Sequence, residues 1–65
     1  MIDLTKLNNQ EITINAELIQ SIEETPDTTI TLTTGKVLVV RESRQTVKDL
    51  VVKYKHKIYG IPEQN

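Results

Sequence analysis

The stretch "TTITLTTGKVLVV", residues 28–40, determines the centre of the predicted fold. Apolar residues alternate with threonines, and threonine favours extended backbone because it branches at Cβ. Thr34 and Gly35 interrupt the alternation, and Gly35 adopts positive φ without steric strain. We therefore predict strands at 28–33 and 36–40 joined by a two-residue loop. The threonine-rich run is then a piece of sheet and not a cluster of catalytic hydroxyls.

That two-residue loop fixes which side chains share a face of the hairpin. It pairs Leu32 with Val37 and Ile30 with Val39, which places these four on one face. The opposite face is half polar. We predict that it forms a contact between copies of the chain, through Thr29, Thr31, Leu38 and Val40.

Three earlier segments also resemble strands, at 1–7, 11–15 and about 19–24, with turns at Asn8-Asn9, 15–18 and Pro26-Asp27. A two-residue loop at Asn8-Asn9 places Ile2 and Leu4 on one face and Ile12 and Ile14 on the other. One helix cannot cover both faces of such a sheet.

The loop around Pro26-Asp27 leaves a parity choice. An odd number of loop residues places Ile22 on the face of Ile30, and strict alternation then sends Ile19 to the face of Leu38.

A helix follows, with Ser43 as a good N-cap and Gly60 and Pro62 as end signals. One apolar stripe recurs at helical spacing and consists of Val47, Leu50, Val51, Tyr54 and Ile58. The predicted fold is α+β: a small, mainly antiparallel sheet of about five strands, followed by one C-terminal α-helix packed on one face. We predict a single domain over residues 1–60 and a flexible tail over 61–65.

Composition narrows the function classes. A chain of 65 residues buries only about 60% of the surface that its unfolded form exposes, so oligomerisation or docking on a partner is the expected stabiliser. The sequence has no cysteine and a single histidine, His56, and we predict no metal and no cofactor. No apolar run is long enough to span a bilayer and no signal peptide is recognisable, which predicts a cytoplasmic protein without a transmembrane segment.

Charge is unevenly distributed along the chain. Residues 1–35 carry −5 and residues 36–65 carry +4. An acidic sheet beside a basic helix, with charges that largely compensate, is the favoured interpretation. The alternative is an electrostatic partner, and the candidate contacts are then Lys48, Lys53, Lys55 and Lys57.

The residues do not form a recognisable catalytic pattern. There is no histidine-based triad, glycine-rich loop or metal-ligand spacing, and the neighbouring carboxylates of Glu23 and Glu24 diverge because adjacent strand residues point to opposite faces. We predict that the protein is not an enzyme and has no small-molecule substrate. The basic segment could contact nucleic acid, yet Tyr54 lies on the apolar stripe and the segment lacks an arginine for base reading.

Several segments in fixed order resemble the FlbD family of small flagellar proteins: "MIDLTKLN", "INAELIQSIEETPDTTITLTTGK" and "VVRES", followed by a basic helix. The resemblance extends from Met1 to about Ile58. The family often has Asn-Gly where this chain has Asn8-Asn9 and Thr34-Gly35, which alters turn preference but not the overall plan.

This resemblance implies a cytoplasmic, non-enzymatic bacterial protein that supports motility and, in swarming species, raises the power of the flagellar motor. It implies no set of binding residues. The first hypothesis is therefore a protein-binding module that acts on the flagellar motor, its stator or its export machinery, with a peripheral position at the flagellar base. The second is a small nucleic-acid-binding regulator of flagellar gene expression that uses the same lysines.

Overall fold

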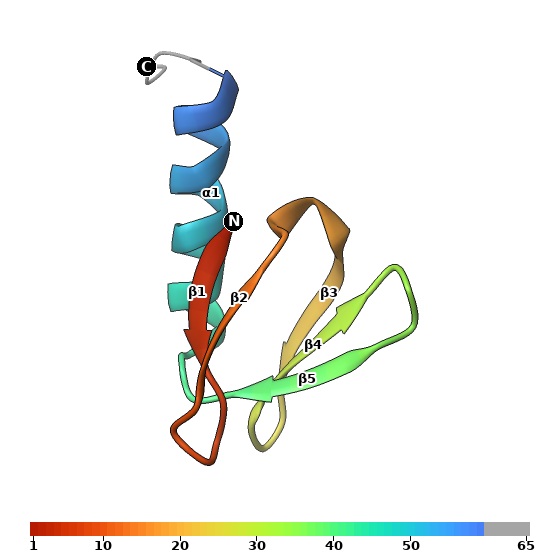
Figure 1. The fold of residues 1–65 in the computed structure, drawn as a ribbon. Coiled ribbons are helices and arrows are strands. Elements are labelled where there is room, and N and C mark those ends of the chain that lie inside the picture. Colours follow the sequence, from red (N-terminus) through yellow and green to blue (C-terminus); the bar gives the residue numbers. More distant parts are fainter. Residues whose placement is uncertain (60–65) are drawn as a thin grey trace.

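The computed structural model describes residues 1–59, with side chains as far as Lys57. Within this range the elements are β1 (Ile2–Thr5), β2 (Glu11–Ile14), the 3-10 helix η1 (Ala16–Leu18), β3 (Ile19–Glu24), β4 (Thr28–Leu32), β5 (Val37–Val40) and α1 (Arg44–Tyr59). The predicted α+β fold, with five antiparallel strands and a C-terminal helix, is confirmed. The strands form two sheets, β1-β2 and β3-β4-β5, and not the single sheet that was predicted. Figure 1 shows α1 running beside β1 and diverging from the three-stranded sheet.

Some predictions fall on residues that the structure does not describe. The helix end at Gly60 and Pro62, the domain boundary at residue 60 and the tail at 61–65 lie outside the described residues, as does the side chain of Ile58.

The β1–β2 hairpin and the β4–β5 hairpin, called the first and the second hairpin, each close with a three-residue loop. The two predicted two-residue loops are therefore wrong. In the first hairpin, the Lys6 N–H donates to the Gln10 carbonyl and the Lys6 carbonyl accepts the Asn9 N–H, both at 2.9 Å. In the second, the Leu32 N–H donates to the Lys36 carbonyl at 2.8 Å and the Leu32 carbonyl accepts the Gly35 N–H at 2.9 Å. Asn9 (φ 72°) and Gly35 (φ 94°) are left-handed, as a three-residue hairpin loop requires at its last position.

The third loop residue shifts the register, so that Ile12 and Ile14 share a face with Ile2 and Leu4, and Leu38 and Val40 share a face with Ile30 and Leu32. Leu4 pairs with Ile12, and Ile30 pairs with Leu38. The predicted second apolar face is therefore wrong: Leu38 and Val40 are buried in the single chain. The outward face of the second hairpin consists of Thr29, Thr31, Val37 and Val39. Self-association stays a prediction, and Thr29 and Thr31 belong to the face that remains available for it.

The length of the loop between β3 and β4 resolves the parity choice. Because Glu24 pairs with Thr28, the loop has three residues, and this odd number places Ile22 opposite Ile30. The register then shifts between Ile19 and Ser21. The extra residue turns Ile19 to the same side as Ile22, which strict alternation had assigned to the opposite face.

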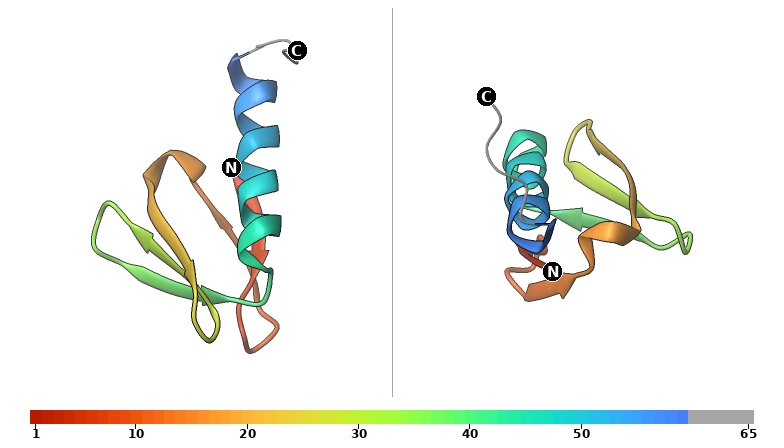
Figure 2. Two further views of the ribbon diagram at one scale, coloured as in Figure 1. Left: turned by 180° about the vertical axis from the view of Figure 1, so that it is seen from behind. Right: turned by 90° about the horizontal axis from the view of Figure 1, so that it is seen from above.

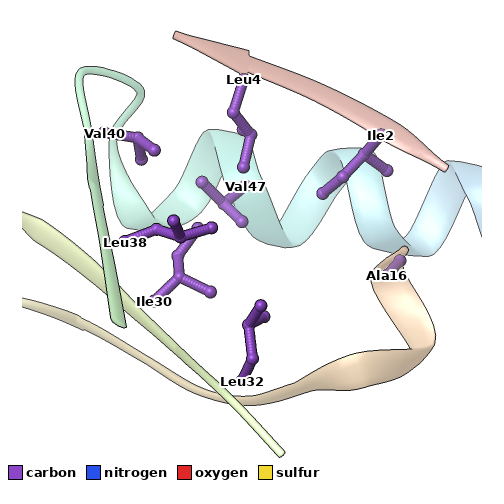
Figure 3. Close-up of a cluster of buried hydrophobic side chains, with 8 residues drawn as sticks. All are labelled: Ile2, Leu4, Ala16, Ile30, Leu32, Leu38, Val40 and Val47. Carbon is purple, nitrogen blue, oxygen red and sulfur yellow. The ribbon is translucent and has the colours of Figure 1, made fainter. Parts of the chain in front are cut away.

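The core lies between α1 and the two sheets. Figure 3 shows Leu4 from β1 and Val47 from α1 pointing toward one another, above Ile30 and Leu38. The buried apolar side chains are Ile2, Leu4, Ala16, Ile30, Leu32, Leu38, Val40 and Val47. Full burial of such a side chain contributes roughly 1.5–3 kcal/mol. Leu50, Val51 and Tyr54 are partly buried against this cluster, which confirms the predicted stripe as far as Tyr54.

Three hydrogen bonds hold the junction where α1 begins. Ser43 is the N-cap as predicted, because its Oγ accepts the N–H of Thr46 at 3.1 Å. Glu24 at the end of β3 accepts the N–H of Arg44 through Oε1 at 2.9 Å. Both acceptors satisfy N–H groups that have no partner within the helix. Glu42 Oε1 accepts the N–H of Thr5 at 2.9 Å and ties the junction to β1.

Candidate functional site

The four predicted lysine contacts lie on two different sides of α1. All four are exposed. Lys48 and Lys55 are seven residues apart and Lys53 and Lys57 are four apart, so each pair lines up along the helix while the pairs face different ways. The structure therefore divides the predicted basic cluster into two separate sites.

Lys48 and Lys55 flank the first of these sites, which we call the α1–β3 groove. Its lining is formed by Ala16, Ile19, Ile22, Lys48, Val51, Val52 and Lys55, around a volume of about 230 Å³. Val52 is 52% exposed, a high value for an apolar residue beside a groove. Cations border this apolar surface, and none of the described residues that line it is acidic.

The local fold explains why apolar side chains reach this groove. Asn15 caps η1, its Oδ1 accepting the N–H of Glu17 at 2.9 Å, within the turn that the sequence predicts at 15–18. The 3-10 turn and the bulge in β3 together direct Ala16, Ile19 and Ile22 toward α1. Thr33 N–H donates to the Leu18 carbonyl at 2.7 Å, which links the end of η1 to the β4–β5 turn. The wall facing α1 is thereby fixed by backbone contacts.

Lys53 and Lys57 flank a second groove on the other side of α1, the α1–β1 groove. It is lined by Met1, Ile2, Asp3, Leu50, Lys53, Tyr54 and Lys57, with a volume of about 240 Å³. Asp3 lies among these residues, and its Oδ1 also accepts the hydroxyl of Thr13 at 2.7 Å. A carboxylate in the lining reduces the positive potential there. Of the two sides of α1, the α1–β3 groove therefore suits an acidic partner better.

Glu42 is the one titratable group with a resolved shift among the described residues. Burial raises its pKa, but hydrogen bonds from backbone N–H groups of Thr5 and of Glu42 itself outweigh burial, and the pKa lies below its ordinary value. A depressed pKa indicates that the charged carboxylate is stabilised in the folded protein. Glu42 therefore acts as a structural acceptor at the junction, on the side of β1.

Sequence reasoning found the lysines but missed the groove residues. The predicted faces of Ile19 and Ile22 do not take the bulge in β3 into account. Val52 lies outside the predicted core stripe. The signal for Val52 is its spacing, because it follows Lys48 by four residues and precedes Lys55 by three, so all three share one helix face.

The fold and these grooves define a small α+β domain whose candidate site is a lysine-flanked apolar groove between a helix and a sheet. The family model described as FlbD, flagellar and swarming motility proteins, matches residues 1–59, so the chain belongs to the FlbD family. No curated protein and no solved structure matches the chain. FlbD is a flagellar motility family and is not known as an enzyme family. No helix within residues 1–59 is long and apolar enough to cross a membrane.

Proposed function

We propose that the protein is a non-enzymatic, cytoplasmic motility factor that raises flagellar motor power through protein contacts, and that the α1–β3 groove is the contact surface. Membership of the FlbD family supports the motility role. The single observation that carries the contact surface is the groove itself, where Lys48 and Lys55 border half-buried and exposed apolar side chains. Apolar surface supplies affinity, and flanking cations select an acidic partner and orient it.

The partner that fits this groove is an acidic surface of a motor, stator or export component. Lys48 and Lys55 lie about two helical turns apart, roughly 10 Å along the axis. Carboxylates at a similar spacing on the partner would meet both lysines while an apolar side chain between them contacts Val52. The division of the lysines between two faces supports a local protein contact over a continuous phosphate-binding track.

Matched charge reversals on α1 test the proposal. Lys48→Glu/Lys55→Glu and Lys53→Glu/Lys57→Glu change the net charge equally and alter the same helix, but only the first pair borders the α1–β3 groove. Each variant replaces the wild-type protein in motile cells, and motor torque is measured from the rotation of tethered cells. We expect the first variant to lower torque and the second to retain it. Equal losses in both variants, at equal protein levels, would exclude the groove as the contact surface.

Val52→Glu tests the apolar part of the same surface. Because Val52 is exposed, the substitution leaves the buried core intact, and circular dichroism checks this. We expect cross-linked partners recovered from motile cells to fall at least tenfold with Val52→Glu, as with Lys48→Glu/Lys55→Glu.

The nucleic-acid alternative has its own readout. Micromolar binding of the wild-type chain to random DNA or RNA, with a steep loss of affinity as salt rises, would favour the regulator and count against the proposal.

A further inference from the structure

A separate surface lies along the outer edge of β5, on the far side of the three-stranded sheet from β3. The sheet order β3-β4-β5 leaves β5 at an edge. The first hairpin joins the Val40 end of this edge, through a bridge between Lys6 and Val40 and an N–H···O bond from Arg41 to Thr5 of 2.7 Å. Figures 1 and 2 show β5 continuing from that point toward the β4–β5 turn, away from β1 and β2.

The register determines which backbone groups of β5 face this edge. Leu32 and Lys36 are opposite one another and hydrogen-bonded, with an N···O distance of 2.8 Å. Hydrogen-bonded pairs alternate with non-hydrogen-bonded pairs along an antiparallel ladder, so Val37 and Val39 occupy the non-hydrogen-bonded positions opposite Thr31 and Thr29. Their N–H and C=O groups point away from β4. The Val39 carbonyl faces Leu7 across the Lys6–Val40 bridge, whereas both groups of Val37 face the open part of the edge. An edge of this kind is a template for one more strand.

Side chains beside the edge indicate what that strand would carry. A groove of about 410 Å³ is lined by Lys6, Leu7, Asn8, Lys36, Val37, Leu38 and Val39. Leu7 is 44% exposed and Val37 is 55% exposed, so apolar surface is available on both sides of it. Among the described residues of the lining, the two charged ones are lysines. Arg41 is adjacent because its Nη2 donates to the Leu7 carbonyl at 3.0 Å.

The charge pattern distinguishes between the occupants of this groove. A second copy related by a two-fold axis would bring its own Lys6 and Lys36 against the same two lysines, and like charges placed together oppose pairing. An acidic strand meets opposite charge instead. We infer that the β5 edge binds an extended segment of a partner protein, with alternating apolar and acidic residues, as an added strand. This inference is independent of the α1–β3 groove, which lies on another part of the surface.

Two synthetic peptides test the inference directly. One peptide of eight residues alternates valine and glutamate, and the other alternates valine and lysine; both are capped at their ends. Each is titrated into the ¹⁵N-labelled full chain and followed by amide chemical shifts. We expect the glutamate peptide to shift the amides of Val37 and Val39 and to slow their hydrogen exchange, and the lysine peptide to leave them unchanged.

Charge reversal at the groove provides the matched control. Lys6→Glu/Lys36→Glu should weaken the glutamate peptide by about tenfold, because two favourable ion pairs become repulsive, and should confer binding of the lysine peptide. Val37→Pro should abolish binding of the glutamate peptide since it removes an outward N–H that β4 does not use. The amide spectrum of each variant shows whether it folds, and the charge reversal alone suffices if the proline variant does not.

Three outcomes would overturn the inference. Shifts confined to Val51, Val52 and Lys55 would place the acidic segment in the α1–β3 groove. Concentration-dependent shifts at Val37 and Val39 without peptide would identify a second copy as the occupant. The absence of binding at millimolar peptide would show that the edge does not accept an acidic strand.

Discussion

The two ends of α1 have different surroundings. Where the helix begins, Val47 is fully buried, and Glu24 and Ser43 accept N–H groups of its first turn. Further along, Leu50, Val51 and Tyr54 are only partly buried, and a groove lies on each side. The first end holds the fold together, whereas the second leaves apolar and basic surface for a partner.

The difference follows from the lengths of the elements. The strands contain four to six residues, whereas α1 contains 16. A helix of this length extends about 24 Å at 1.5 Å per residue, and a four-residue strand extends about 13 Å. Because α1 starts where β5 ends, its second half extends beyond the sheets, as Figure 1 shows. The residues there cannot be covered fully by a domain of this size.

The largest expected effect is the difference in stability between alanine substitutions at two valines of α1. Val47→Ala leaves a cavity in the core and should lower the free energy of unfolding by about 2–3 kcal/mol. Val52→Ala, at an exposed position, should change it by no more than about 0.5 kcal/mol. Urea denaturation with an unchanged m-value measures both. Similar losses for the two valines would mean that the second half of α1 is as well packed as the first.

A smaller effect is expected from the helix cap. Ser43→Ala removes the acceptor for the Thr46 N–H and should lower the free energy of unfolding by about 1 kcal/mol. Ser21→Ala, at an exposed position in β3, is the control and should be nearly neutral. The same denaturation measurement applies. A neutral Ser43→Ala would show that the cap does not strengthen this end of the helix.

The smallest effect depends on pH and concerns Glu42. Because its pKa is lower in the folded protein than in the unfolded chain, the unfolded chain binds more protons between the two values and stability rises with pH there. The charged carboxylate of Glu42 stabilises the fold fully at pH values above the ordinary glutamate pKa. This stabilisation is lost as the pH falls through the pKa of Glu42 in the folded protein. Glu42→Gln keeps an oxygen acceptor but not the charge. Its deficit against the wild type should therefore be present at pH 7 and shrink toward pH 3; a deficit independent of pH would contradict the assignment.

Much of the fold could be predicted from local sequence patterns. Alternation in residues 28–40 predicts two strands because successive side chains in extended backbone point to opposite faces. Ser43 and the 3.6-residue spacing that follows predict the start and the buried side of α1 in the same local way. The turn at 15–18 and the turn residue Gly35 are predicted for equally local reasons.

Loop length could not be predicted in the same way. Gly35 permits positive φ in a two-residue or a three-residue loop, and Asn9 tolerates it in either. In the first hairpin burial makes the choice, since only the three-residue loop brings Leu4 together with Ile12. In the second hairpin either loop gives Ile30 an apolar partner, and packing in the whole domain selects Leu38. A domain with one helix gains most when all of these side chains share the face that the helix covers.

The candidate site, like the fold, has features that local sequence predicts and features that only tertiary packing decides. Lys48, Lys53, Lys55 and Lys57 were identified from sequence because charge is a property of each residue. Their separation into two grooves depends on where η1, β3 and β1 pack against α1, which no local pattern specifies. Lys6 and Lys36 were not recognised as a pair because they are distant in the sequence and meet only at the β5 edge.

The sequence by itself determined the order and type of the elements, the start of the helix and the family, since these depend on short-range periodicity, turn residues and motifs. The tertiary structure alone decided the register of both hairpins, the bulge that turns Ile19 inward, and the grooves that flank α1 and β5. These features are set by the competition among faces for burial in one small core, and that competition involves residues from every part of the chain.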